Sequence, residues 1–203
     1  MSNQLKIRHI KFSLAKAIYE WHHKTNNPPQ GHQISYVALV GDDWHYALPA
    51  DYVKCQDDWF DDSNHDVKIR TDEAGDLAVY TRGKIIGVCS IGNPVARWND
   101  KKVKEITRIC FTDYFHPVSN TERKYFSKLV REAMKDFVQS YEVSKFVTYI
   151  HDNQSGKYLE YAGMHKDHHK KYGASDKGWA NRQGRAQSCL TGKYRFVKLE
   201  DVA

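Results

Sequence analysis

A strand, helix and strand between residues 103 and 150 constrain the fold of this chain most. Apolar pairs recur at 125/126, 129/130, 133/134 and 137/138, which predicts a long amphipathic helix that begins at the capping sequence Ser119-Asn120-Thr121-Glu122. Aliphatic and aromatic residues fill residues 103–112 and 145–150 on either side. Because a helix that joins two buried strands makes them parallel neighbours, the sequence predicts an α/β fold with a βαβ crossover.

The other apolar segments extend this unit into a mixed sheet. Their predicted forms are a helix at 12–22, a strand at 31–40, a hairpin of strands 77–80 and 85–91 with its turn at Arg82-Gly83-Lys84, a short helix at 153–161 and a strand at 190–199. The length of 203 residues suits one domain, so we expect a single mixed-sheet domain over residues 1–203.

Charge is divided unevenly along the chain, although the net charge is only +6. Residues 42–76 contain 11 acidic and 3 basic residues and are typical of an acidic insertion, whereas residues 164–198 contain 9 basic and 2 acidic residues. A charged run is most often a solvated surface. The basic segment also carries side chains that stack on bases or hydrogen-bond to them, which favours double-stranded DNA as a partner. The predicted DNA contacts are Lys170, Lys171, Trp179, Asn181, Arg182 and Arg185.

The sequence favours a cytoplasmic protein. Uninterrupted apolar runs are too short to span a bilayer, and the first residues lack the basic-then-apolar layout of a signal peptide. The four cysteines lie far apart without a Cys-x-x-Cys pair, which fits a reduced compartment and argues against a cysteine-based zinc site. The oligomeric state stays open.

Charged residues in or beside predicted strands are candidate catalytic groups. Glu105 and Arg108 lie in the strand at 103–112, where a buried charge needs a partner or a ligand. Residues three apart on a strand face opposite sides unless a bulge intervenes, and an ordinary surface pair is the alternative. Asp152 follows the strand at 145–150, where α/β folds display functional groups, and an N-cap is its alternative.

Histidines near Pro28-Pro29 form a second candidate group, which Glu105, His151 and Asp152 could join in space. They are His22, His23 and His32. Histidine transfers protons near neutral pH and also binds metals. Their spacing matches no standard metal motif, so a positioned base is favoured over a divalent metal held by His22, His32 and Asp152. Packing at the end of the first helix is the structural alternative.

The start of the long helix is a candidate anion site. Backbone N–H groups at Ser119, Asn120 and Thr121 would face a pyrophosphate, and simple capping of the helix is the alternative. The order of strands and helices is similar to that of the GCN5-related N-acetyltransferases, which have a glycine-rich turn here for acetyl-CoA. Residues 113–119 of this chain contain no glycine.

Several short motifs together resemble the Mom family of bacteriophage DNA-modification proteins, a divergent branch with an acetyltransferase-like fold. The motifs are His22-His23, Pro28-Pro29-x-Gly31-His32, Gly87-Val88, Gly92-x-Pro94-Val95-Ala96-Arg97, Glu105-Ile106-Thr107-Arg108, Pro117-Val118-Ser119, Val147-Thr148-Tyr149, Asn153-Gln154-Ser155-Gly156, Tyr161-Ala162-Gly163 and Trp179-x-Asn181-Arg182-x-x-Arg185. They cover most of residues 19–185 outside the acidic segment.

This resemblance implies an enzyme that places a carbamoylmethyl group on N6 of adenine in DNA and so blocks restriction enzymes. It implies that Arg108 and Ser119 lie near the cofactor or acyl group and that Tyr149 lines the site. His22, His23 and Asp152 would surround the reacting base. An acyl donor such as acetyl-CoA and a divalent metal such as iron are the implied cofactors.

Two other functions fit the same sequence. An ordinary acetyl-CoA-dependent N-acetyltransferase for a small amine or a protein would use Glu105 as a base, and its basic segment would be plain surface. A non-catalytic interaction protein would use the acidic segment as a mimic of nucleic acid.

Overall fold

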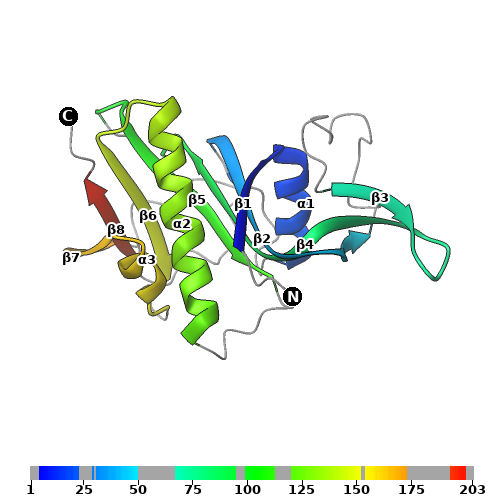
Figure 1. Cartoon of the computed structure of the whole chain (residues 1–203). Helices are drawn as coiled ribbons and strands as arrows, with labels where there is room; N and C mark the ends of the chain where they lie inside the picture. Colours follow the sequence, from blue (N-terminus) through cyan, green and yellow to red (C-terminus); the bar gives the residue numbers. More distant parts are fainter. Residues whose placement is uncertain are drawn as a thin grey trace, which may run out of the picture.

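The computed structural model is one mixed sheet with helices on both faces (Figure 1). It describes residues 5–22, 29, 31–49, 67–94, 99–112, 120–151, 154–172 and 193–199, with the backbone alone at 67, 120–123, 151, 168–172 and 193. The elements are β1 (Leu5–Ile10), α1 (Phe12–His22), β2 (His32–Pro49), β3 (Val67–Thr71), β4 (Leu77–Gly92), β5 (Val103–Phe111), α2 (Asn120–Ser140), β6 (Lys145–His151), α3 (Lys157–Tyr161), β7 (His165–Tyr172) and β8 (Lys193–Leu199).

The strand order places the predicted crossover at the centre of the sheet. Strands follow the order β1-β2-β4-β5-β6-β8-β7, and β3 pairs with β4 beside this path. β5 and β6 run parallel and are joined by α2, while the other strand pairs are antiparallel. The expected α/β fold with one βαβ unit is therefore confirmed.

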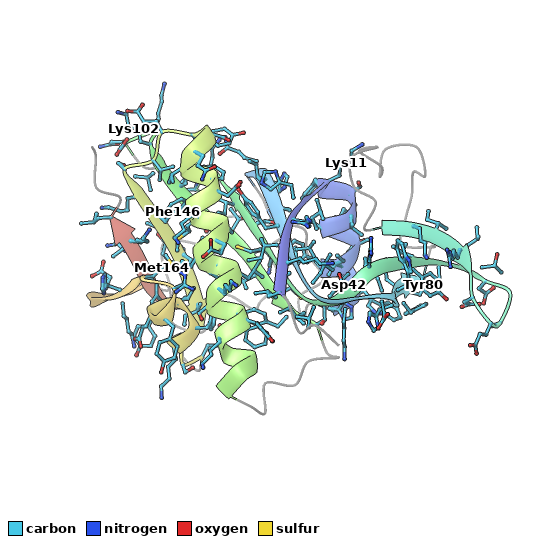
Figure 2. All side chains as sticks on the ribbon, viewed as in Figure 1. Lys11, Asp42, Tyr80, Lys102, Phe146 and Met164 are labelled. Carbon is cyan, nitrogen blue, oxygen red and sulfur yellow. The ribbon has the colours of Figure 1, made fainter. Side chains whose placement is uncertain are left out.

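Each face of the sheet carries its own apolar core. α2 buries the residues of its predicted stripe against the sheet, among them Leu129, Met134 and Phe137. Phe146 and Met164 belong to this core, beside α2 in Figure 2. α1 packs on the opposite face, where Ile18 and other residues meet β2 and β4. Burying one large apolar side chain contributes roughly 1.5–3 kcal/mol, so these stripes dock both helices.

The predicted hairpin at Arg82-Gly83-Lys84 is wrong, because β4 continues straight through it. Gly83 has a φ of 101° and lies opposite a bulge in β2 that contains Gly41, whose φ is 86°. A Cβ on Gly83 would stand 2.9 Å from the carbonyl oxygen of Gly41. The glycine thus serves a close approach of two strands rather than a turn. The end of β2 (residues 44–49) and the beginning of β4 (residues 77–82) extend with β3 away from the rest of the sheet. Tyr80 lies in this extension (Figure 2).

Part of the predicted acidic insertion belongs to the sheet. Residues 42–49 continue β2 and residues 67–71 form β3, while residues 50–66 lie outside the described residues. β1, β3 and β7 were not predicted, since their polar residues obscure any alternation of apolar side chains. The short helix begins at Lys157, after Gly156 with a φ of 64°, and is therefore shorter than expected. No helix in the described part of the chain is long and apolar enough to cross a membrane.

Candidate functional site

The two parallel strands separate after a short paired stretch, and this split is the centre of the candidate site. β5 and β6 pair only from Val103 with Lys145 to Glu105 with Val147. Beyond that point β5 stays paired to β4, and β6 stays paired to β8. The sheet therefore opens at the carboxyl ends of its two parallel strands, where α/β folds bind ligands.

A side chain spans the start of the split. The buried Thr148 Oγ1 donates a hydrogen bond to the backbone oxygen of Ile106, at 2.9 Å. On the α2 side, aromatic rings from three elements meet near the end of β5. Phe111 stacks on Phe126 with ring centroids 3.6 Å apart, and its edge-on contact with Tyr158 measures 5.3 Å. Among the described residues, the split thus lies between two strands whose mutual ladder has ended, and it has an aromatic wall on the α2 side.

A bulge in β5 brings Glu105 and Arg108 to the same face of the sheet. Arg108 pairs with Ser90, and Ile106 pairs with Ile91, so Thr107 is an extra residue in β5. Glu105 pairs with Gly92, two residues from Ser90 on the same side of β4. Both charged residues therefore face the side that α1 covers. The alternation of a regular strand would have separated them, and the bulge that the sequence left open decides this geometry.

Two cross-strand rows of polar residues interrupt the apolar face under α1. One row is Ser35, Ser90 and Arg108, and the other is His32, Gly92 and Glu105. A Cβ on Gly92 would stand 1.9 Å from the carbonyl oxygen of Gly31, so the backbone before β2 packs directly on this row. Two glycines permit this approach, which sets the position of His32.

A hydrogen bond between His32 and Ser35 connects the two rows, and further hydrogen bonds reach a tyrosine of α1. The Ser35 Oγ lies 2.9 Å from His32 Nε2 and 2.6 Å from the Ser90 Oγ. The Ser90 Oγ lies 2.8 Å from the Tyr19 hydroxyl. The Tyr19 hydroxyl donates to the backbone oxygen of Arg108, at 3.4 Å. The chain of contacts therefore runs from the start of β2 to the bulge of β5.

Burial shifts the pKa of three groups in this cluster. It raises the pKa of the fully buried Tyr19 well above its ordinary value. It lowers the pKa of His32 and also that of Arg108. Glu105 is also largely buried, with 9% of its residue surface exposed. A carboxylate and a guanidinium on one buried face beside a split sheet are typical of a reaction site.

β6 contributes residues on the far side of the split. Val147 pairs with Glu105, and Tyr149, two residues further along β6, faces the same side. Tyr149 pairs with Arg195 of β8, whose guanidinium binds the carboxylate of Asp167 with an Nε–Oδ2 distance of 3.0 Å. The predicted Glu105, Arg108 and Tyr149 are therefore all on one face around the split.

The structure separates the predicted histidines. The His32 ring lies 4.3 Å from that of Phe12, the first residue of α1, whereas His22 is the last residue of this helix. Ten residues of helix rise about 15 Å, so the expected cluster of His22 with His32 does not form. In the part of the chain that the structure describes, no three His, Cys, Asp or Glu side chains are grouped as metal ligands.

The side chains of the other predicted residues lie outside the part of the chain that the structure describes. Asn120 and Thr121 open α2, and Lys170 and Lys171 lie in β7, with only their backbones described. Those outside the described residues are His23, Ser119, Asp152, Trp179, Asn181, Arg182 and Arg185. Sequence reasoning missed Tyr19, Ser35 and Ser90. The available signal was a hydroxyl inside a predicted apolar stripe or strand.

Comparison of the chain with known proteins gives a fold. No protein-family model and no curated protein matches the sequence. A crystal structure of a protein assigned as a phosphinothricin N-acetyltransferase aligns over 97% of this chain and 98% of its own, with a TM-score of 0.50 and 15% identity. The fold is that of the GCN5-related N-acetyltransferases.

Two further structures of this acetyltransferase fold align along nearly the whole chain. A GNAT-family acetyltransferase from Bacillus anthracis covers 98% of this chain and 96% of its own, with 8% identity and a TM-score of 0.49. The Arabidopsis thaliana NAA60 structure, a complex with acetyl-CoA, covers 97% and 98%, with 11% identity and a TM-score of 0.49. Identities this low leave the activity to be argued from the site.

Proposed function

We propose that this protein is an acyl-CoA-dependent N-acyltransferase. The observation that carries the proposal is the split between β5 and β6 after Glu105 and Val147. Unpaired strand edges bind extended chains through backbone hydrogen bonds, and the pantetheine arm of coenzyme A is an extended chain with two amides. The aromatic wall of Phe111, Phe126 and Tyr158 suits the apolar part of such an arm. These features fit the cofactor.

The start of α2 is suited to the pyrophosphate of coenzyme A. Asn120 opens α2, which follows the carboxyl end of β5 after residues 113–119. The first backbone N–H groups of a helix attract phosphate. Since residues 113–119 contain no glycine, we propose that helix N–H groups contribute more to pyrophosphate binding here than a glycine-rich turn would.

The charged pair of β5 supports acyl transfer to an amine. When bound, the thioester supplies an activated acyl group. Glu105 is placed to accept the proton that the attacking amine loses, because its carboxylate lies on the α1 face beside the split. Arg108 on the same face stabilises the negative charge that develops on oxygen during the transfer. Tyr149 orients the acceptor from the β6 side.

The proposal is tested with the purified full-length chain. We expect isothermal titration calorimetry to detect acetyl-CoA binding and a thiol reagent to detect coenzyme A release when amines are added. Glu105→Gln should lower kcat by roughly 10²–10⁴-fold with little change in acetyl-CoA affinity, since it removes the base and keeps the shape. Glu142→Gln, an exposed carboxylate that contacts Lys102, is the matched control. Absence of both binding and thiol release would overturn the proposal.

DNA adenine is the second candidate acceptor, as the resemblance to the Mom family implies. The observation that favours it is the edge strand β7, which carries Lys166, Lys170 and Lys171 in one strand of eight residues. A strip of cations along an edge suits a phosphate backbone. Edge strands also carry lysines merely to prevent sheet pairing, which is the competing explanation.

Two measurements separate these explanations. Mass spectrometry of nucleosides from DNA of cells that express the chain would reveal a modified adenine. Lys170→Gln with Lys171→Gln should weaken DNA binding and flatten its dependence on salt, whereas Lys128→Gln with Lys135→Gln on α2 should not. Unmodified nucleosides together with unchanged DNA binding would contradict DNA adenine as the acceptor. The lysines of β7 would then serve to prevent sheet pairing, and the acceptor would be another amine.

A further inference from the structure

The four contacts of the buried hydroxyl chain under α1 can all form together in only one donor direction. The backbone oxygen of Arg108 can only accept, so its contact forms when the single hydroxyl proton of Tyr19 points to it. Tyr19 must then accept from Ser90. Each hydroxyl has one proton, so the donors along the chain are determined from this end.

The same count of donated protons also determines the protonation of His32 at Nε2. Ser90 donates to Tyr19 and so accepts from Ser35, and Ser35 then accepts from His32. The four contacts need four protons, and three hydroxyls supply three. The fourth proton is therefore the N–H at Nε2 of His32. If Nε2 instead carried a lone pair, the three hydroxyl protons would turn toward His32 and the contact with the Arg108 oxygen would be lost first.

The contact between the Tyr19 hydroxyl and the Arg108 backbone oxygen is the weakest of the four, and it is the one that touches β5. At 3.4 Å it is the longest of the four, and it ends on the bulged segment of β5 that carries both Glu105 and Arg108. A bulge leaves an extra residue outside the regular ladder, so its geometry depends on bonds such as this one. The position of the proton on His32 is thus coupled to the proposed reaction site through the hydrogen bonds of three buried hydroxyls.

We propose that His32 is a positioning residue for acyl transfer, which donates through Nε2 and so holds the bulge of β5 in its active geometry. This inference rests on the proposed function. The Phe12 ring packs 4.3 Å from the His32 ring and fixes its orientation, while the burial of His32 favours the neutral ring. Glu105 lies in the same cross-strand row, across Gly92, and Arg108 and Cys110 are the other titratable groups of β5 on this side.

The first test reads the tautomer without any assay of activity. In ¹⁵N-labelled protein above pH 7, the nuclear magnetic resonance signals of the His32 ring should show a protonated Nε2 and an unprotonated Nδ1. Ser35→Ala should reduce this preference to that of a free neutral imidazole, whereas Ser35→Thr should keep it because the hydroxyl remains. An unprotonated Nε2 in the wild-type protein would overturn the proposal, whatever the enzyme acts on.

The second test asks whether His32 and Tyr19 act through one chain. Two serines separate them, so independent structural roles would give additive effects. We expect His32→Leu and Tyr19→Phe each to lower kcat by about tenfold, the range of one lost hydrogen bond, and the double variant to lower it by little more. His32→Gln, whose amide can still donate, should recover most of the activity lost in His32→Leu.

The outcomes separate this inference from the proposed function. A hundredfold loss in the double variant, or equal activity of His32→Leu and His32→Gln, would overturn the positioning role while acyl transfer stands. Lack of acyl transfer by the wild-type chain would overturn the function. Hydrogen exchange at residues 106–110 then tests the remaining structural link: it should be faster in His32→Leu than in His32→Gln, and equal rates would overturn it.

Discussion

Thr148 of β6 donates a hydrogen bond to the backbone oxygen of Ile106 in β5 at the point where the parallel ladder of these strands ends. A side-chain hydroxyl here takes over the role of the next backbone N–H. This single bond allows the strands to separate without leaving a buried carbonyl oxygen unsatisfied at the start of the split. It therefore permits the opening on which the proposed acyltransferase site depends.

Replacing that hydroxyl should destabilise the protein. Thr148→Val keeps the shape and removes the donor, so the buried oxygen of Ile106 loses this partner, and we expect a loss of about 1–3 kcal/mol in the free energy of unfolding. Urea unfolding measures it. Thr148→Ser retains the hydroxyl and is the control, and an unchanged unfolding midpoint in Thr148→Val would contradict this reading of the split.

Gly92→Ala should destabilise the protein by steric conflict. Its Cβ would stand 1.9 Å from the backbone oxygen of Gly31, which cannot move aside without displacing the start of β2. Gly75→Ala is the matched control, because Gly75 has open space around its Cβ and only the strain of a φ of 91°. We expect Gly75→Ala to cost about 1–2 kcal/mol and Gly92→Ala to cost more. Equal melting temperatures would refute the close packing of the two glycines.

The pH dependence of stability should report the burial of His32. Burial lowers its folded-state pKa below the ordinary value, so as the pH falls through 6.5 the unfolded chain takes up the proton first. Stability that is present above this pH is then lost until the pH passes the folded pKa. Urea unfolding from pH 8 to pH 5 should show wild type losing stability relative to His32→Gln, and a constant difference would contradict the shift.

Cys89 should resist chemical modification in the native protein. Burial raises the pKa of this thiol to about 12, so almost no thiolate exists at pH 8. Mass spectrometry after iodoacetamide treatment should find Cys89 unlabelled in buffer and labelled in urea. Labelling of Cys89 without denaturant, at the rate seen in urea, would show that this part of the core opens readily.

Local patterns were sufficient to predict the helices that cover the sheet. α2 follows from apolar pairs at helical spacing, and its observed bounds, Asn120–Ser140, agree with the predicted start. The strands on either side were equally apparent, because buried central strands are apolar along their length. Their order fixed the crossover, so the α/β class could be read without tertiary information.

Strands at the edges could not be predicted in this way. β7 has the sequence of a charged surface run, and β3 contains two basic residues in five positions. Such segments become strands only because a neighbouring strand offers unpaired backbone groups. The turn predicted at Gly83 of β4 was wrong for a related reason. A glycine with a positive φ occurs both in turns and where two backbones approach closely, and only the position of Gly41 decides between these here.

The sequence by itself therefore determined the central elements, their order and the charged residues Glu105 and Arg108, since periodicity and composition are properties of neighbouring residues. Only the tertiary structure decided that a bulge places those two residues on one face, and that Tyr19 reaches Ser90 across 71 positions of the chain. Hydrogen bonds between distant residues depend on which strands become neighbours, and no local pattern records that choice.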